Sequence, residues 1–144
     1  MSLPSTDVNE VDKNNKVACM IASGVSSYPL TPDPLDVLGN QEKLQESFYY
    51  SCDTMARGEY PFYAQRIWDK YGVKLDIQEG DLELLKEGKS DYIAFSYYSS
   101  SAFTTHVDKS AMYGNLSMGA NNPYVKKSDW GWSMDPAGLK YTLE

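Results

Sequence analysis

The sequence predicts an α/β fold in which two parallel strands are joined by a crossover of helices. Three observations lead to this prediction. The apolar run "KVACMIAS" at residues 16–23 has strand length and is typical of a strand covered on both faces. The run "DYIAFSYYSS" at residues 91–100 is rich in aromatic and β-branched residues and indicates a second strand. The residues between the two runs have helical periodicity, so the pair is a βαβ unit with parallel strands.

Three helices are expected in the crossover. The first begins near Pro34 and stops at Arg57-Gly58, and its apolar residues recur at helical spacing: Leu44, Phe48, Cys52 and Met55. The second begins in "GEYPFYAQ", where Pro61 suits a first-turn position, and Gly72 is its natural C-terminal cap. The apolar stripe of the second helix should face the core: Ala64, Ile67, Trp68 and Tyr71.

The third helix is expected in "GDLELLKEG", with Asp81 as its N-cap and Gly88 as its end. Loops are expected in "SGVSSYPLTPDP" after the first strand and from Ser100 to about Pro136, where no periodicity is visible. A connection that long is usually functional or belongs to something larger. Two strands are also too few for a stable parallel sheet. The sequence therefore favours a fragment, or an assembly of several copies that pair through exposed strand edges.

Composition narrows the class of protein. The 144 residues carry a net charge of −7, and Lys and Arg are scattered, which argues against nucleic-acid binding and against docking on an anionic membrane. No apolar run approaches the ~20 residues that cross a bilayer. Residues 1–14 form a polar tail whose Met-Ser-Leu start is typical of a cloning vector. Without a secretion signal, Cys19 and Cys52 are expected to be buried thiols rather than a disulfide, and the cytoplasm is the expected location.

Most of the familiar catalytic patterns have little support. His106 is the only histidine, and a lone loop histidine is more often solvated than catalytic. No His/Cys cluster has metal-ligand spacing, and no Gly-rich phosphate cradle follows either strand, so neither a metal nor a cofactor is expected. Glu59 lies in a turn between helices and is interpreted as structural, capping or pairing with Arg57 or Arg66.

Aromatic and amide side chains gather at the end of the second strand and in the loop after it. Tyr97 and Tyr98 end the strand, and the loop adds Asn121, Asn122, Lys126, Lys127, Trp130 and Trp132. Such rings stack on the apolar faces of sugars while hydroxyl and amide groups bond their edges. Taken alone, these residues fit a saccharide site, a peptide groove or a crowded loop cluster.

Four co-linear motifs resemble glycoside hydrolase family 1, and its bacterial 6-phospho-β-glucosidase branch in particular. They are "KVACMIAS", "RGEYP", "DYIAFSYYSS" and "NNPYVKKSDWGWSMDPAGLKY", and they extend from about Asn15 to Tyr141. The resemblance implies residues 15–144 of a (β/α)8 barrel, from strand five to the helix before strand seven. It also implies a retaining β-glycosidase that uses two glutamates and takes phosphorylated β-glucosides.

Few functional residues carry over from this resemblance. Tyr98 falls on the tyrosine that hydrogen-bonds the nucleophile and helps set its ionisation, and Ser96 stands where many members have asparagine. Trp132 falls on the aglycone-side tryptophan, and Trp130 and Asn122 match positions with a loop role first and substrate contact second. The Asn-Glu-Pro motif of the acid/base and the Glu-Asn-Gly motif of the nucleophile do not occur in the sequence.

The resemblance therefore predicts that the isolated chain is inactive. Its natural small-molecule partner would be a phosphorylated β-glucoside, with self-association of the fragment. Two alternatives stay open: a stand-alone saccharide- or phosphosugar-binding module, and a polypeptide without a function of its own. The sequence does not decide between gluco- and galacto-configured substrates.

Overall fold

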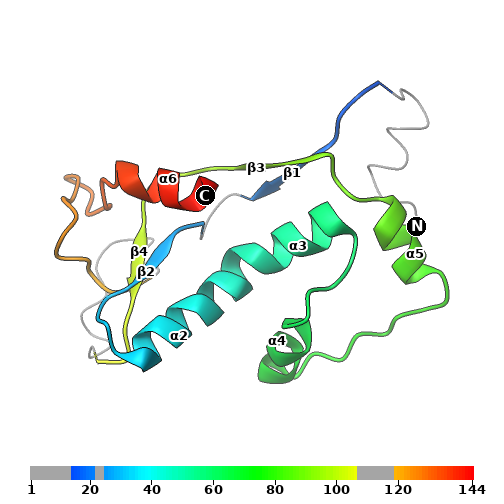
Figure 1. Cartoon of the computed structure of the whole chain (residues 1–144), viewed down its shortest axis with the longest axis horizontal. Coiled ribbons are helices and arrows are strands. Elements are labelled where there is room, and N and C mark those ends of the chain that lie inside the picture. Colours follow the sequence, from blue (N-terminus) through cyan, green and yellow to red (C-terminus); the bar gives the residue numbers. More distant parts are fainter. Residues whose placement is uncertain (1–13, 22–24, 107–118) are drawn as a thin grey trace. The chain divides into compact units, whose positions relative to one another are not determined.

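Two parallel strand pairs organise the described part of the chain (Figure 1). The structure, a computed structural model, describes residues 14–21, 25–106 and 119–144. Its residues fall into two compact units, which are described separately. The first unit comprises Met1–Ile21 and Phe48–Phe95, and the second comprises Ala22–Ser47 and Ser96–Glu144.

The sheet of the first unit is the predicted parallel pair. Strand β1 (Ala18–Ile21) lies beside β3 (Tyr92–Phe95), with Ala18 opposite Tyr92 and Ile21 opposite Phe95. This pairing confirms the predicted βαβ connection. Strand β3 is shorter than predicted: it ends at Phe95, whereas the predicted strand extended to Ser100.

The helix predicted between Pro34 and Gly58 is confirmed, although it has an irregular centre. It consists of α2 (Pro34–Leu44), the π-helix η1 (Gln45–Tyr49) and α3 (Tyr50–Arg57). Gly58 ends it with φ 69°, and its N–H donates to the Thr54 carbonyl. A side chain at Gly58 would also meet the Lys86 backbone, with Cβ 2.6 Å from Cα. Glycine is therefore required at this stop by both conformation and space.

The other two helices are where they were predicted, with different N-terminal ends. Helix α4 (Ala64–Tyr71) begins after Pro61, whose carbonyl accepts from the Ala64 N–H in a preceding turn, so the first-turn assignment of Pro61 was wrong. Helix α5 (Asp81–Glu87) has Gly80 as its N-cap. Asp81 is instead its first residue, and its carboxylate accepts from the Gln78 N–H, which lies outside the helix. Gly72 and Gly88 end the two helices as predicted.

The apolar stripes are only partly buried. Leu44, Phe48 and Ala64 are buried, whereas Met55 and Tyr71 are exposed. Trp68 packs as predicted: it is half-buried, its ring meets Tyr60 edge-on, and its Nε1 donates to the Tyr50 hydroxyl at 3.2 Å. Position on a helical stripe thus did not guarantee burial at the helix ends.

Two short strands in the second unit contradict the predicted loops. Strand β2 (Ser27–Pro29) lies in the segment "SGVSSYPLTPDP", and β4 (Ser101–Phe103) lies in the segment without periodicity. The two pair in parallel, with Ser27 opposite Ser101. Neither strand has an alternating apolar pattern, because serine and proline occupy half of their positions; hydrophobic periodicity could not reveal them.

Buried polar groups connect α2 to this second sheet. The Asn40 amide donates to the Ser27 carbonyl at 3.0 Å, and the Lys43 ammonium donates to the hydroxyls of Ser27 and Ser101 at 3.3 and 2.9 Å. Because Lys43 reaches one residue on each strand, it supports the register of the pair. Burial lowers the pKa of Lys43 to about 8.

The C-terminal helix α6 (Pro136–Leu143) confirms the helix start expected in "PAGLKY". It is capped by Asp135, whose carboxylate accepts from the Gly138 N–H at 3.0 Å. The Thr142 hydroxyl donates to the carbonyls of Val25 and Gly138, and Tyr141 packs its ring 5.3 Å from that of Tyr28. These contacts hold α6 against the residues around β2.

Candidate functional site

The structure brings together the two aromatic residues that sequence reasoning singled out most strongly. The rings of Tyr98 and Trp132 meet edge to face, with centroids 5.8 Å apart and planes at 79°. Tyr98 lies beyond the end of β3, whereas Trp132 belongs to the segment that precedes α6. Tyr98 remains 68% exposed and Trp132 36% exposed, so both rings keep surface that a ligand can reach. Both residues lie in the second compact unit.

The segment that carries Trp132 is a small, well-bonded hairpin. An antiparallel bridge joins Lys127 to Ser133, and the Lys127 ammonium donates to the Ser133 hydroxyl at 2.8 Å. The Ser128 N–H donates to the Trp132 carbonyl, and the Trp132 N–H donates to the Ser128 hydroxyl. Gly131 supplies the positive φ of 82° that closes the turn. The backbone beneath Trp132 is therefore fixed by its own hydrogen bonds.

The other two predicted aglycone-side residues lie on the same segment in different settings. Trp130 is 82% exposed at the hairpin turn. Asn122 is half-buried, and its side-chain oxygen accepts from the Tyr124 N–H at 3.0 Å. That bond shapes the local turn, in keeping with a loop role for Asn122. Trp130 offers an open indole face, whereas the acceptor atom of Asn122 is engaged within the chain.

Tyr97, the neighbour of Tyr98, bonds to Asp135, the N-cap residue of α6 that follows the hairpin in sequence. Its hydroxyl donates to the Asp135 carbonyl at 2.6 Å, and the Tyr28 hydroxyl donates to the Asp135 carboxylate at 2.9 Å. Burial raises the pKa of Tyr28 to about 12, with the hydrogen bond and charge of Asp135 adding to the effect. Burial also raises the pKa of Tyr97. Both phenols are therefore held in the protonated, donating form across the physiological range.

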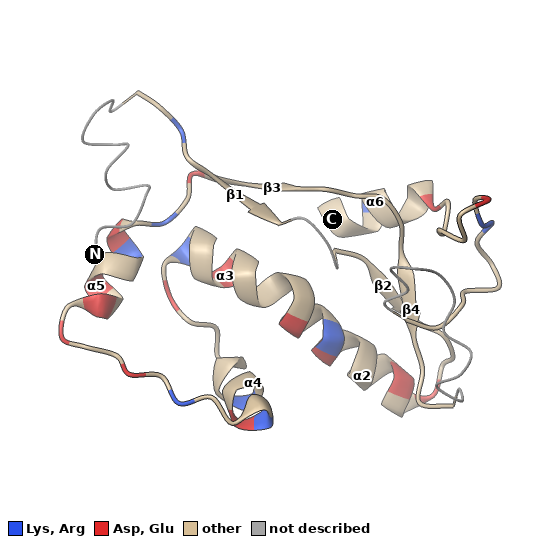
Figure 2. Ribbon diagram, turned by 180° about the vertical axis from the view of Figure 1, so that it is seen from behind, with Lys and Arg blue, Asp and Glu red and all other residues tan. Residues whose placement is uncertain are grey.

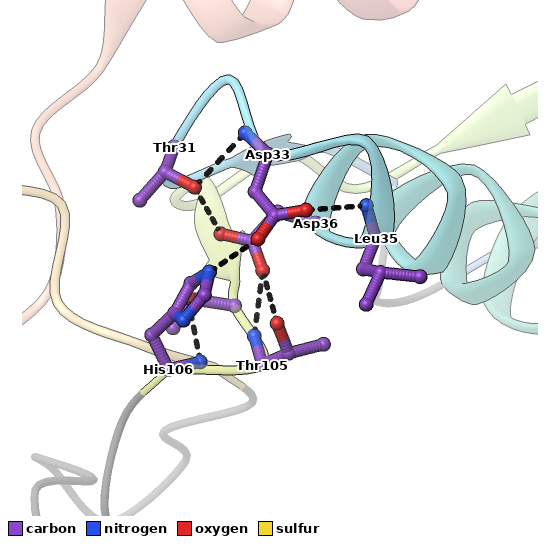
Figure 3. Close-up of polar contacts among 7 residues, drawn as sticks. Thr31, Asp33, Leu35, Asp36, Thr105 and His106 are labelled. Atoms are coloured by element: carbon purple, nitrogen blue, oxygen red, sulfur yellow. Dashed lines mark hydrogen bonds and ion pairs between the residues drawn. The ribbon is translucent and has the colours of Figure 1, made fainter.

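The lone histidine has an ion-pair partner rather than a nucleophile. His106 Nε2 lies 2.7 Å from the Asp33 carboxylate, which also caps α2 by accepting from the Leu35 N–H (Figure 3). The His106 side chain is 54% exposed. This arrangement connects the residues after β4 to the start of α2.

Asp36 lies beside this pair and is fully buried. It accepts from the hydroxyls of Thr31 and Thr105 and from the Thr105 N–H, at distances of 2.6–2.9 Å (Figure 3). Burial alone would raise the pKa of Asp36, but these hydrogen bonds outweigh it and hold the pKa well below its usual range. Sequence reasoning missed this carboxylate because its partner Thr105 lies 69 positions away in the chain.

Charges and cysteines give no second candidate site. Figure 2 shows Lys and Arg positions spread over several elements with Asp and Glu positions among them. Arg57 pairs with Asp53 at 3.1 Å, not with Glu59 as one alternative had it. Cys19 and Cys52 are free thiols as predicted, with Cys19 buried and Cys52 only half-buried. Burial raises the pKa of both thiols, and that of Cys52 to about 11, which makes them weak nucleophiles.

None of the described helices is long and apolar enough to cross a membrane. No group of three or more His, Cys, Asp or Glu side chains in residues 14–21, 25–106 and 119–144 could hold a metal ion.

The described geometry is a parallel α/β crossover in one compact unit and an exposed aromatic pair, Tyr98 and Trp132, in the other. The model of glycosyl hydrolase family 1 matches residues 5–144. The chain belongs to this family.

Relatives and solved structures support the same assignment. The chain is 43% identical over 136 residues to the aryl-phospho-β-D-glucosidase BglH of Bacillus subtilis (strain 168), which covers 94% of this chain and 29% of that protein. It is 36% identical to the 6-phospho-β-glucosidase AscB of Escherichia coli (strain K12), covering 99% of this chain and 30% of that protein. The chain thus spans about three-tenths of the length of these relatives.

The fold likeness is independent of close sequence similarity. The structure matches a β-glucosidase of this family from Exiguobacterium antarcticum B7 with a TM-score of 0.70 at 18% identity, covering 96% of this chain and 31% of that one. The fold is that of part of a (β/α)8 barrel. Both parallel pairs and the helices that join their strands are elements of such a barrel.

Proposed function

We propose that this chain is part of a retaining β-glycosidase that hydrolyses 6-phospho-β-glucosides, such as phosphorylated cellobiose or aryl glucosides. The edge-to-face contact of Tyr98 with Trp132 beyond β3 is the observation that supports this most. Family membership supports the reaction class, and the relatives' names support a phosphorylated substrate. The proposed location is the cytoplasm.

In this proposal Tyr98 steadies the nucleophile. A phenol that donates a hydrogen bond to a carboxylate favours its charged form, which is the form that attacks the sugar. The Tyr98 ring is held on one side by Trp132, while its exposure leaves the hydroxyl accessible to a neighbouring carboxylate. Trp132 takes the leaving group against its indole face, Trp130 extends that aromatic surface, and Asn122 shapes the loop that presents both.

The isolated chain is proposed to be inactive. Retaining hydrolysis needs two carboxylates about 5 Å apart, and neither sequence motif that bears them in the family occurs in the chain. The test is incubation of the purified chain with 4-nitrophenyl β-D-glucoside 6-phosphate. No release of 4-nitrophenol is expected, and steady turnover that follows the chain through gel filtration would contradict this part of the proposal.

A hybrid enzyme tests the substrate class. The matching segment of BglH is replaced by this chain, and hydrolysis of 4-nitrophenyl β-D-glucoside 6-phosphate is measured beside that of the unphosphorylated glucoside. We expect activity on the phosphorylated substrate. In the hybrid, Tyr98→Phe should lower kcat about 10- to 100-fold, because one hydrogen bond to a charged group is removed. Trp132→Ala should chiefly raise KM.

Tyr124→Phe is the matched control for the tyrosine variant. Tyr124 is 91% exposed, and its backbone N–H rather than its hydroxyl donates to Asn122, so removal of the hydroxyl should leave kcat unchanged. A folded hybrid that is inactive on both substrates would contradict the proposed function. Equal losses for Tyr98→Phe and Tyr124→Phe would contradict the role of Tyr98.

A saccharide-binding module is a second candidate function. One observation favours it: the Tyr98–Trp132 surface and the hairpin beneath it are complete within one compact unit of this chain. It predicts that the chain alone binds 4-nitrophenyl β-D-glucoside 6-phosphate, and that binding is lost in Trp132→Ala. Calorimetry that shows no heat with the chain at millimolar ligand would exclude it. The same samples in light scattering test the proposed self-association, which a monodisperse monomer would contradict.

A further inference from the structure

Two adjacent tyrosines hold the segment Trp132–Asp135 at both of its ends. The ring centroids of Tyr98 and Trp132 are 5.8 Å apart, and the Tyr97 hydroxyl donates to the Asp135 carbonyl at 2.6 Å. Trp132 is an exposed residue of the hairpin, whereas Asp135 is half-buried and is the N-cap residue of α6. The Tyr97–Tyr98 pair therefore contacts this segment at an exposed residue and at a half-buried one.

A third contact, from Tyr28, holds Asp135 in place. The Tyr28 hydroxyl, from β2, donates to the Asp135 carboxylate at 2.9 Å, while the other oxygen of that carboxylate accepts from the Gly138 N–H at 3.0 Å. Asp135 thus joins β2, the residues after β3 and the start of α6. Burial would raise the pKa of Asp135, but the hydrogen bonds it receives lower it, so the acceptor stays charged.

Gly138 gives independent support for this arrangement. A Cβ at this position would contact the Tyr97 hydroxyl, would lie 2.7 Å from the Asp135 carboxylate and would lie 3.1 Å from the Tyr28 hydroxyl. Gly138 is buried in the first turn of α6, where glycine is less favourable than alanine by about 1 kcal/mol. Its backbone conformation does not require glycine, since Gly138 is not among the glycines with positive φ. The space it leaves is occupied by the two phenol hydroxyls.

We propose that Tyr97, Tyr28 and Asp135 form a polar latch that positions Trp132 against Tyr98. Gly138 has no side chain and so leaves the room that the latch needs. The members of the latch are positioning residues, because they touch Trp132 only through the chain. Without the latch, the hairpin keeps its internal hydrogen bonds but loses its anchor to β2 and to Tyr97. Trp132 then leaves the edge of the Tyr98 ring.

The indole N–H signals of the chain measure this directly. The three tryptophans give three resonances in a nitrogen–proton NMR spectrum of the full chain, assigned with Trp132→Phe and Trp130→Phe. Trp132 should carry a ring-current shift from Tyr98, which Tyr98→Leu removes. We expect Tyr97→Phe and Tyr28→Phe to move the Trp132 signal toward its position in Tyr98→Leu. The Trp68 signal, which reports on the first compact unit, should stay in place.

Gly138→Ala keeps all three members of the latch and adds only a methyl group, which would occupy the space of the Tyr97 hydroxyl and the Asp135 carboxylate. Alanine favours the helix, so a simple gain in helix stability should leave Trp132 unmoved. A shift of the Trp132 signal in the same direction as in Tyr97→Phe is expected instead. Tyr124→Phe, which removes an exposed hydroxyl near the same hairpin, is the matched control and should change none of the three signals.

Each outcome decides the proposal. An unmoved Trp132 signal in Tyr97→Phe and Tyr28→Phe overturns it. Collapse of the Trp68 signal together with that of Trp132 in both variants shows a general stabilising role and also overturns it. A shift confined to Trp132 supports it.

A ligand titration tests the latch separately from the proposed function. The predicted effect of the latch on ligand binding rests on that proposed function. 4-Nitrophenyl β-D-glucoside 6-phosphate is titrated into the chain and followed at the Trp132 signal. Binding should weaken about three- to tenfold in Tyr97→Phe, the effect of one hydrogen bond. No response in the unmodified chain would count against ligand binding by this chain and would leave the ring shift as evidence for the latch. Unchanged affinity in Tyr97→Phe, despite a shifted ring, would show that the latch does not govern binding.

Discussion

The two compact units keep different kinds of side chain out of water. The buried residues of the first unit are mainly apolar: Cys19, Ile21, Phe48, Tyr63 and Ala64. Among the described residues, every buried polar side chain lies in the second unit: Ser26, Ser27, Asp36, Asn40, Ser100 and Ser133. Apolar burial is non-directional, whereas hydrogen bonds prescribe distance and angle.

This difference teaches where positional accuracy is needed. The candidate site belongs to the unit with the polar interior, and the Trp132 hairpin is placed by hydrogen bonds at Ser128, Ser133 and Asp135. Hydrogen bonds in a polar interior favour one arrangement of the groups that make them, although Ser26 Oγ and Asn40 Oδ1 in this unit are buried without a hydrogen-bond partner. The buried residues of the first unit are mainly apolar, and this unit is stabilised by packing.

The largest expected effect is on the apolar unit. Phe48 is buried and meets Phe95 edge-on at 6.0 Å, so Phe48→Ala leaves a cavity and should cost about 4 kcal/mol of unfolding free energy. Urea unfolding followed at Trp68 measures it. Phe62→Ala is the control in the same unit, because Phe62 is 93% exposed and its loss should change stability by less than about 0.5 kcal/mol. Similar losses for both variants would mean that apolar packing does not hold this unit.

The next effect should come from Asp36 in the polar unit. Asp36→Ala removes the acceptor of two threonine hydroxyls and one backbone N–H in a partly buried site, so we expect a clear fall in the urea midpoint. Asp36→Asn, which keeps the shape and one acceptor oxygen, should fall less. Asp33→Ala is the comparison at the same helix end and should cost about 1 kcal/mol, as the loss of an N-cap does. If Asp36→Ala were the milder change, the polar interior would not be what stabilises this unit.

The pH dependence of stability sharpens the comparison, because two half-buried titratable groups of the polar unit, Lys43 and Tyr28, act in opposite directions. The pKa of Lys43 is lowered from 10.5 to about 8, so the folded state binds fewer protons than the unfolded state between these values, and stability should rise with pH there. The pKa of Tyr28 is raised from 10.0 to about 12, so its stabilising contribution is complete below pH 10 and is lost between pH 10 and 12.

Stability of the polar unit should therefore pass through a maximum near about pH 10. Unfolding followed at Trp132 between pH 7 and 11.5 tests this. Lys43→Met should flatten the rising limb, and Tyr28→Phe should flatten the falling limb. A profile that is the same in both variants and in the unmodified chain would show that these groups do not control it.

The smallest expected effect is at Trp130. Its ring is 82% exposed, so Trp130→Ala should change the free energy of unfolding by less than about 0.5 kcal/mol. In the BglH hybrid the same variant should raise KM if the indole contacts the leaving group. A stability loss comparable to that of Phe48→Ala would show instead that Trp130 is a packing residue.

Sequence reasoning succeeded where burial is apolar and local. The strand at β1, the parallel partner at β3, and the helix ends at Gly58, Gly72 and Gly88 follow from periodicity and glycine placement. It failed at β2 and β4, which are short and rich in serine. Asn40 and Lys43 of α2 hydrogen-bond to these strands, and no local pattern encodes those bonds.

The candidate site divides in the same way. Its aromatic composition, and Tyr98 and Trp132 as its leading members, could be predicted from the sequence through strand-end placement and family motifs. The roles of Tyr97, Tyr28 and Asp135 could not. The Tyr28–Asp135 hydrogen bond joins residues 107 positions apart, and only the folded chain brings them together.

The sequence by itself thus determined the α/β class, the parallel pair β1–β3 and the family. These follow from hydrophobic periodicity, from glycines at helix ends and from contiguous motifs. The tertiary structure alone decided that a second parallel pair exists, that Asp36 is buried and that Tyr98 contacts Trp132 while Tyr97 bonds to Asp135. The physical reason is that apolar burial leaves a periodic signature along the chain. A hydrogen bond between distant polar groups leaves none.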